Sequence, residues 1–292
     1  MPIYKYYEPD SLSFILNEIG VSLRYSQPEI LNDPFELQPT LKTMVDQYRE
    51  KIDSDLSECD QEIILKKYQN GMKEFYSNAL NKTKGILSLT KNGYSRPMWA
   101  YYSKNHTGYI IEFNSEDRIP VSITFDIERP KSTISGSYFN THGIFKPIST
   151  YQKIPKVTPL YEKDEYNTEN DSYILDGVTF HNAIYTTNRT NSPSDEIYEY
   201  YYKKDKQWEH EQEIRAVKEI SLDECTYSVL NGYPIFTKIL DSKHVKSIIL
   251  GVRSSPELEQ DIRLWVNKYA KDVIIKKARL CDSKFKLIYD EI

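Results

Sequence analysis

Short segments in which apolar and polar residues alternate are the feature that most constrains the fold of this chain. In VSLRYS, residues 21–26, Val21, Leu23 and Tyr25 share one face and polar side chains take the other, the pattern of a half-buried strand. Similar apolar stretches predict strands at 2–7, 85–90, 108–113, 244–251, 272–278 and 285–292, with weaker strand signals at 121–125 and 155–161. The chain is therefore expected to build a sizeable sheet.

Fewer segments have helical spacing. DSLSFILNEIG (10–20), RPMWAYYS (96–103) and SSPELEQDIRLWVNKYA (254–270) predict helices, the last with Ser255 as N-cap and Pro256 in its first turn. A further helix is expected around 172–186, and a polar helical pair about 41–82 has the character of an insertion. Strands outnumber helices and no linker interrupts the sequence, so we expect a single α+β domain over residues 1–292.

Composition and charge exclude several classes of protein. The net charge is −5 with acids and bases interleaved, which argues against a general polyanion binder. No apolar run approaches the ~18 residues of a membrane span, and the N-terminus has no signal-peptide pattern. The 3 cysteines are odd in number and unpaired in spacing, which predicts reduced thiols in a cytoplasmic protein without membrane association.

Several common site motifs are missing from the sequence. The 5 histidines show no zinc-ligand spacing, and the 10 glycines form neither a Walker nor a dinucleotide-binding loop. There is also no G-x-S-x-G nucleophile motif. No metal cofactor is expected.

The acidic run EHEQEIRAV, residues 209–217, is the strongest candidate site. In a strand, Glu209, Glu211 and Glu213 would share one face. That face is a solvated edge if Arg215 and the lysines at 203, 204 and 206 neutralise it. It is a Mg²⁺ nuclease site if the three carboxylates bind metal, although Arg215 stands where such nucleases use a proton-exchanging lysine.

The third interpretation is a catalytic pair. At the mouth of a cleft, one of Glu211 and Glu213 would hold a ribose hydroxyl and stabilise a cationic sugar, while the other accepts a proton from a nucleophile. Trp99 and Tyr102, three apart on a helix, are either core residues or a surface that stacks on a ring. With Tyr25 they could also line the pocket of a non-catalytic sensor or binding module.

Three further expectations concern neighbouring segments. The NDPFE turn, residues 32–36, should border the cleft with Phe35 packed inward. Trp208, on the opposite strand face from the acids, should be largely buried. Arg215 should pair with a carboxylate, with Glu112 as the candidate.

The ordered blocks of the sequence resemble one large prokaryotic and phage family. These blocks are ILNDPFE (30–36), MWAYYSKNHTGYIIEF (98–113), WEHEQEIR (208–215) and VKSIILG (245–251). They resemble domain-of-unknown-function family 2971, whose members are associated with abortive infection and antiphage defence. This resemblance implies a defence or toxin-type effector, with a partner protein or antitoxin possible.

The opening strand, helix and strand also resemble the start of ADP-ribosyltransferase-like domains. This resemblance implies a mixed β core with peripheral helices, and NAD as a substrate whose ADP-ribose passes to an acceptor, protein or nucleic acid, or to water. It places Glu213 on the nicotinamide ribose and Glu211 at the acceptor. The residues expected around NAD are Tyr4, Lys5, Tyr6, Ser26, Asn32, Asp33, Ser88, Trp99 and Tyr102. The first strand lacks the usual His or Arg, so Lys5 or Tyr6 takes that position.

Overall fold

A large mixed sheet dominates the computed structural model of the chain, which describes residues 1–37, 41–52, 55–76, 83–120, 137–139, 145–147, 171–189, 197–221, 226–230 and 233–292. The chain divides into two compact units, Met1–Pro120 with Asp171–Ile292, and Val121–Asn170. In the second unit, β6 (Ser137–Phe139) and β7 (Phe145–Pro147) form an antiparallel pair.

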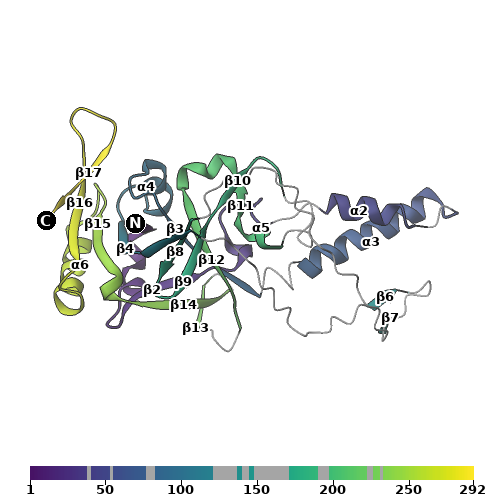
Figure 1. Ribbon diagram of the computed structural model, residues 1–292, viewed down its shortest axis with the longest axis horizontal. Coiled ribbons are helices and arrows are strands. Elements are labelled where there is room, and N and C mark those ends of the chain that lie inside the picture. The colour runs from purple at the N-terminus through teal and green to yellow at the C-terminus, as the bar shows by residue number, and fades with distance from the viewer. Residues whose placement is uncertain are drawn as a thin grey trace. The chain divides into compact units, whose positions relative to one another are not determined.

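Ten strands form this sheet within the described residues, in the order β17-β16-β15-β4-β1-β3-β12-β9-β8-β5 (Figure 1). They are β1 (Pro2–Tyr7), β3 (Lys84–Thr90), β4 (Tyr109–Asn114), β5 (Glu116–Pro120), β8 (Asp171–Leu175), β9 (Val178–Asn182), β12 (Glu213–Glu219), β15 (Val245–Leu250), β16 (Ile274–Leu280) and β17 (Leu287–Glu291). Within the described residues of this sheet, β15 and β16 are the one parallel pair. The order places β1 and β12 on either side of β3, although they are about 200 residues apart in the chain.

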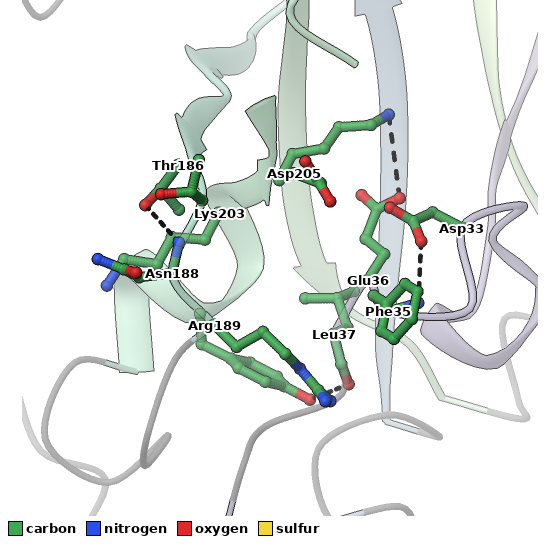
Figure 2. A pocket seen from close by; sticks show the side chains of 12 residues that line it. Asp33, Phe35, Glu36, Leu37, Thr186, Asn188, Arg189, Lys203 and Asp205 are labelled. Carbon is green, nitrogen blue, oxygen red and sulfur yellow. Dashed lines mark hydrogen bonds and ion pairs between the residues drawn. The ribbon is translucent and has the colours of Figure 1, made fainter. Parts of the chain in front are cut away.

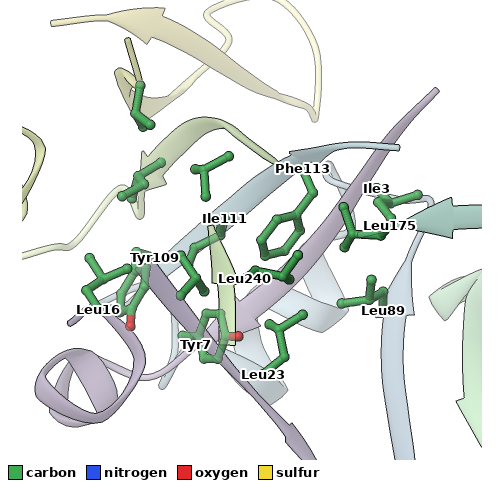
Figure 3. Close-up of a cluster of buried hydrophobic side chains, with 14 of the residues drawn as sticks. Ile3, Tyr7, Leu16, Leu23, Leu89, Tyr109, Ile111, Phe113, Leu175 and Leu240 are labelled. Atoms are coloured by element: carbon green, nitrogen blue, oxygen red, sulfur yellow. The ribbon is translucent and has the colours of Figure 1, made fainter. Parts of the chain in front are cut away.

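A smaller sheet supplies the other side of the main core. It contains β2 (Gly20–Tyr25), β14 (Tyr233–Asp241) and β13 (Thr226–Leu230), paired in the order β13-β14-β2. Leu23 of β2 and Leu240 of β14 pack with Ile3, Leu89 and residues of β4 in one buried cluster (Figure 3). The alternating pattern at 21–26 is thus confirmed, because every second side chain of β2 enters this core.

The first predicted helix is shorter than its spacing suggests. A 3-10 turn η1 (Pro9–Ser11) leads into α1 (Leu12–Ile15), which ends at once. Asn17 accepts hydrogen bonds at its side chain from the backbone N–H groups of Ile19 and Gly20, and this turn directs the chain into β2. The helix predicted over 10–20 is therefore wrong in length, and Ile19 is exposed.

The helix predicted around 172–186 is also wrong. Residues 171–186 form β8, β9 and β10 (Ile184–Thr186), with a turn at Asp176 and Gly177, both at positive φ. A glycine that adopts positive φ without strain favours a tight turn between strands, and this signal outweighs the apolar spacing. The strands predicted at 121–125 and 155–161 lie outside the described residues.

The remaining predicted elements are confirmed. The helix α4 (Arg96–Tyr102) is capped by the Ser95 side chain, which accepts from Met98 N–H. The helix α6 (Pro256–Tyr269) is capped by Ser255 in the same way, and its buried face packs into the main core. Two helices, α2 (Lys42–Arg49) and α3 (Glu58–Tyr76), lie within the range 41–82 and stack Tyr48 on Tyr68. The fold is α+β.

Two further expectations concern cysteines and membranes. Cys59 and Cys281 are free thiols, and Cys225 lies outside the described residues. None of the helices in the described part of the chain has the length and apolar character needed to cross a membrane.

Gly108 is a position where the fold tolerates no side chain. A Cβ there would lie 2.0 Å from the carbonyl oxygen of Tyr7, whereas one at Gly71 in α3 would have nothing within 4 Å. We expect Gly108→Ala to destabilise the protein by about 1–3 kcal/mol or more, because the backbones of β1 and β4 must move apart. Gly71→Ala is the matched control and should stabilise by about 0.5–1 kcal/mol. Urea denaturation measures both, and equal effects would contradict the close approach.

Candidate functional site

The acidic run does not form a continuous strand. Residues Lys206–Glu211 form a 3-10 helix, η4, Gln212 follows in the left-handed conformation with φ 46°, and β12 begins at Glu213. Asp205 caps η4 by accepting from Gln207 N–H at 2.9 Å, a local bond typical of this residue type. The prediction of three carboxylates on one strand face is therefore wrong, and Glu209 is exposed while Glu211 and Glu213 are buried.

Sheet register places Glu213 and Arg215 beside the first strand. Glu213 pairs with Thr90 of β3, which in turn pairs with Tyr4 of β1. Arg215 pairs with Ser88, one step along the same face. Cross-strand neighbours in a sheet share a face, so the end of β12 brings its charged side chains next to residues near the N-terminus.

Arg215 is the centre of a buried ionic network. Its side chain is 1 % exposed and forms a bidentate pair with Glu213, Nε to Oε1 and Nη2 to Oε2, both at 2.9 Å. Its Nη2 also contacts Glu36, and its Nη1 donates to the carbonyl of Tyr201. Burial lowers the pKa of Arg215, and the charge of Asp33 acts in the opposite direction. Arg215 does pair with an acid as predicted, but the partner is not Glu112, which binds Lys246 and Lys276.

Lys204 joins the two carboxylates of the network. It lies on β11 (Lys203–Asp205), and its Nζ is 2.5 Å from Glu211 Oε2 and 2.7 Å from Glu213 Oε2. Glu36 Oε2 is 3.9 Å away. Burial acts to lower the pKa of Lys204, but Glu213 and Glu211 outweigh it and raise that pKa above its usual range. The solvated-edge interpretation assigned the neutralising role correctly to Lys204 and Arg215, yet the cluster is buried rather than solvated.

Tyr102 and Asn32 complete the network on its uncharged side. The Tyr102 hydroxyl donates to Glu211 Oε1 at 2.5 Å and accepts from Asn32 Nδ2 at 2.7 Å. Burial first, and then Glu211, raise the pKa of Tyr102, so its hydroxyl keeps its proton. The start of β12 is fixed as well, because the Tyr185 hydroxyl accepts a hydrogen bond from Glu213 N–H at 2.7 Å.

These groups open onto a cavity of ≈ 160 Å³. It lies where β1 and β3 separate, since these strands pair at Tyr4 and Thr90 while β3 and β12 pair over seven positions. Of the residues predicted around the site, those that line this cavity are Tyr4, Lys5, Tyr6, Ser26, Asn32, Ser88, Tyr102, Glu211 and Glu213. The structure thus brings together nine of the predicted residues.

Two predicted residues lie elsewhere. Asp33 lines a neighbouring cavity of ≈ 230 Å³, which shares Glu36 and Lys204 with the first one (Figure 2). Trp99 is fully buried, packs edge-on against Tyr6 and donates from Nε1 to the Tyr289 hydroxyl at 3.0 Å. The prediction that Trp99 contacts a cofactor is therefore wrong, and the core interpretation applies to it.

The NDPFE turn borders the cavity as predicted, but its side chains are arranged differently. Asp33 Oδ1 accepts from Phe35 N–H at 2.9 Å, which turns the Phe35 ring outward to 61 % exposure. Glu36 enters the buried cluster in its place. The buried guanidinium of Arg215 needs a second carboxylate besides Glu213. The inward position is therefore more favourable for the acid Glu36 than for a phenyl ring.

Trp208 is half-buried, not largely buried as predicted. Because it lies on η4 and not on a strand, it has no strand face opposite the acids. Its ring meets Tyr101 edge-on and lies 5.5 Å from Lys204 Nζ, so it covers the charged end of that lysine.

Three residues of the site were missed by the sequence interpretation. Glu36 was seen only as the last residue of a turn, Lys204 only as one of several neutralising lysines, and Arg24 only as the polar side of a strand. Each lies in a segment whose pattern was recognised, but no local signal distinguishes a buried charge from a solvated one.

The comparisons with known proteins bear on part of the chain. Residues 98–216 match the model of a family described as "Protein of unknown function (DUF2971)". This range runs from α4 to β12 and contains Tyr102, Lys204, Glu211, Glu213 and Arg215, so it supports the family resemblance for the half of the site on these elements. Comparisons with curated proteins and with solved structures found no match.

Removal of the Arg215 guanidinium should destabilise the protein. We expect Arg215→Met to lower the free energy of unfolding by about 3–5 kcal/mol, because Glu213 and Glu36 lose a buried partner. Arg263→Met is the matched control, since Arg263 pairs with Glu259 on the surface of α6, and it should cost less than about 1 kcal/mol. Urea denaturation of both variants decides, and a loss in Arg215→Met no larger than the control's would contradict a supporting role for the network.

Lys5 should titrate well below the ordinary lysine value of 10.5. Burial lowers its pKa to about 8, Glu213 opposes this shift, and Arg24 adds to it. Lys5 is therefore mainly charged at pH 7 and loses its charge as the pH rises through about 8. NMR of the reductively ¹³C-methylated protein measures the titration, with Lys5→Arg to identify the signal. A midpoint near 10.5, the ordinary lysine value, would mean that Lys5 is solvated.

Proposed function

We propose that this protein uses NAD as a substrate, transferring its ADP-ribose to an acceptor or to water, within an ADP-ribosyltransferase-like fold. The observation that carries the proposal is the buried cluster of Glu36, Glu211 and Glu213, which holds three carboxylates against the two cations Lys204 and Arg215. Within this cluster the carboxylates outnumber the cations by one, and such a local excess of negative charge favours a sugar that becomes cationic in the transition state.

The carboxylates retain capacity to bind a ligand. A carboxylate offers about four acceptor sites. Glu213 accepts from Arg215 twice and from Lys204 once, which leaves a site on Oε1. Glu211 accepts from Tyr102 and Lys204, which leaves a site on each oxygen. These bonds also hold both groups in one orientation, so little reorganisation is needed when charge develops.

The proposed reaction follows from these positions. The bond between ribose C1′ and the nicotinamide nitrogen breaks, and both electrons leave with nicotinamide, which departs as a neutral base and needs no acid. Glu213, through its open site, holds a ribose hydroxyl and stabilises the positive charge on the ribose. An acceptor or water then forms the new bond to C1′, and Glu211 takes the proton that it releases.

The two alternatives have less support. The nuclease interpretation needs three carboxylates around a metal, but Glu209 is exposed, and the described residues contain no group of three His, Cys, Asp or Glu side chains placed to hold a metal ion. The binding-module interpretation needs Trp99, Tyr102 and Tyr25 around one pocket, whereas Trp99 and Tyr25 are core residues. A role as a defence or toxin-type effector, acting on a protein or nucleic acid acceptor, rests on the resemblance to the family and is proposed together with the activity.

Glu213→Gln removes the negative charge of this side chain and keeps its shape. We expect NAD turnover to fall by ~10²-fold or more, the scale on which one preorganised electrostatic group acts. Glu211→Gln should impair transfer more than hydrolysis, because water needs less activation once the cation has formed. The assay is NAD consumption and nicotinamide release by the purified protein.

Glu219→Gln is the matched control. Glu219 lies on the same strand, is exposed and pairs with Lys84, so its loss should leave turnover unchanged. Circular dichroism melting of all variants identifies any loss of fold. Absence of NAD consumption in the wild-type protein with every acceptor tried, or an activity lost in chelator and restored by Mg²⁺, would overturn the proposal.

A further inference from the structure

Arg24 is half-buried, and the bonding of its guanidinium is incomplete among the described residues. Its Nε and Nη2 atoms are inaccessible to solvent and have no hydrogen-bond partner among the described residues. Burial lowers the pKa of Arg24, but a guanidinium stays charged in proteins. A buried donor without a partner is costly, so the position of Arg24 needs an explanation that its described neighbours do not supply.

Arg24 and a second cation, Lys5, face the same cavity. Both Arg24 and Lys5 line the cavity of the candidate site, and the charge of Arg24 acts on Lys5. Lys5 Nζ donates to the Ser88 carbonyl at 2.7 Å, which uses one of its three donors. The hydroxyl of Ser26 and the amide of Asn32 lie in the same lining.

The carboxylates of the cavity compensate the charge of this pair only in part, since Glu213 acts on Lys5. Glu36, Glu211 and Glu213 are engaged by Lys204 and Arg215. The lining holds four cations and three carboxylates, which leaves one cation in excess. The cavity therefore joins a carboxylate cluster to a region where positive charge is incompletely compensated.

We propose that Arg24 and Lys5 form a binding site for a phosphoryl group, the diphosphate of a dinucleotide substrate. The choice of a dinucleotide rests on the proposed function, whereas the phosphoryl chemistry does not. Nε and Nη2 are adjacent donors on one edge of the guanidinium, and such an edge binds two oxygens of one phosphate. Lys5 supplies a point charge to the same group. Once the Arg24 side chain turns this edge toward the cavity, a phosphate would satisfy the two nitrogens that the described residues leave unpartnered.

The test measures binding without turnover. The probes are inorganic pyrophosphate and ADP-ribose, with adenosine and nicotinamide riboside as ligands that lack a diphosphate. Calorimetry gives the dissociation constants, and the shift in melting temperature on adding pyrophosphate gives an independent readout. The variants are Arg24→Met and Lys5→Met, with Arg279→Met as a control on an exposed pair with Asp290.

We expect Arg24→Met to weaken binding of pyrophosphate and ADP-ribose by about 10- to 100-fold, the effect of a charge-assisted bond. The same variant should leave binding of the diphosphate-free ligands and the melting temperature without ligand largely unchanged, because no bond within the described protein is lost. Lys5→Met should weaken the same two probes, and Arg279→Met should behave as wild type. If Arg24→Met does not fold, Arg24→Lys keeps the charge at a shorter reach and should show a smaller loss.

The outcomes separate this site from the proposed reaction. Diphosphate binding that depends on Arg24, without NAD consumption, would support the site and overturn the reaction. If the protein consumes NAD and Arg24→Met changes neither the KM for NAD nor the affinity for ADP-ribose, the reaction would be supported and the diphosphate site overturned. Wild-type protein that binds neither pyrophosphate nor ADP-ribose would overturn the site.

Discussion

The buried guanidinium of Arg215 is the interaction on which the rest of the site depends. A charge with 1 % exposure persists only when other groups neutralise it and satisfy its donors. The groups that do so come from three places, Glu213 on the same strand, Glu36 in the turn after β2, and the carbonyl of Tyr201 in α5 (Ile197–Tyr202). One side chain thereby ties the turn at 33–37 and the helix α5 to the central sheet, beside the cavity that Arg215 lines together with Glu36 and Glu213.

The same neutralisation explains how the cavity can present two kinds of charge. Lys204 and Arg215 take up the carboxylates, so that only a part of their acceptor capacity faces the cavity. Because these cations are committed, Lys5 and Arg24 are left without an equal share of acids. A ligand that fits must offer hydroxyls or developing positive charge to the carboxylates and negative charge to the cations. A dinucleotide with a reactive ribose beside a diphosphate combines these features, which is why the two proposals concern one molecule.

The site is assembled from segments with different relationships to known proteins. The family match covers α4 to β12, including Tyr102, Lys204 and the acidic pair, whereas Lys5, Arg24 and Glu36 precede it. The sheet order puts β1 beside β3 and β3 beside β12, so the N-terminal strand completes a site whose other half lies within the matched range. The proposed function therefore depends on contacts between these two parts of the chain as much as on either part.

The sequence by itself determined most of the regular elements and part of the site. The alternation at 21–26, the capped helix at 255–269 and six strands of the central sheet follow from spacing and capping, which act over a few residues. These strands are β1, β3, β4, β15, β16 and β17. It also drew attention to Glu211, Glu213 and the NDPFE turn. Tertiary structure alone decided that the acidic run is broken by a left-handed Gln212, that Phe35 turns outward while Glu36 turns inward, and that Arg215 binds these acids and not Glu112. The physical reason is that burial of a charge depends on partners distant in the chain, and no local pattern records whether the fold will bring those partners within reach.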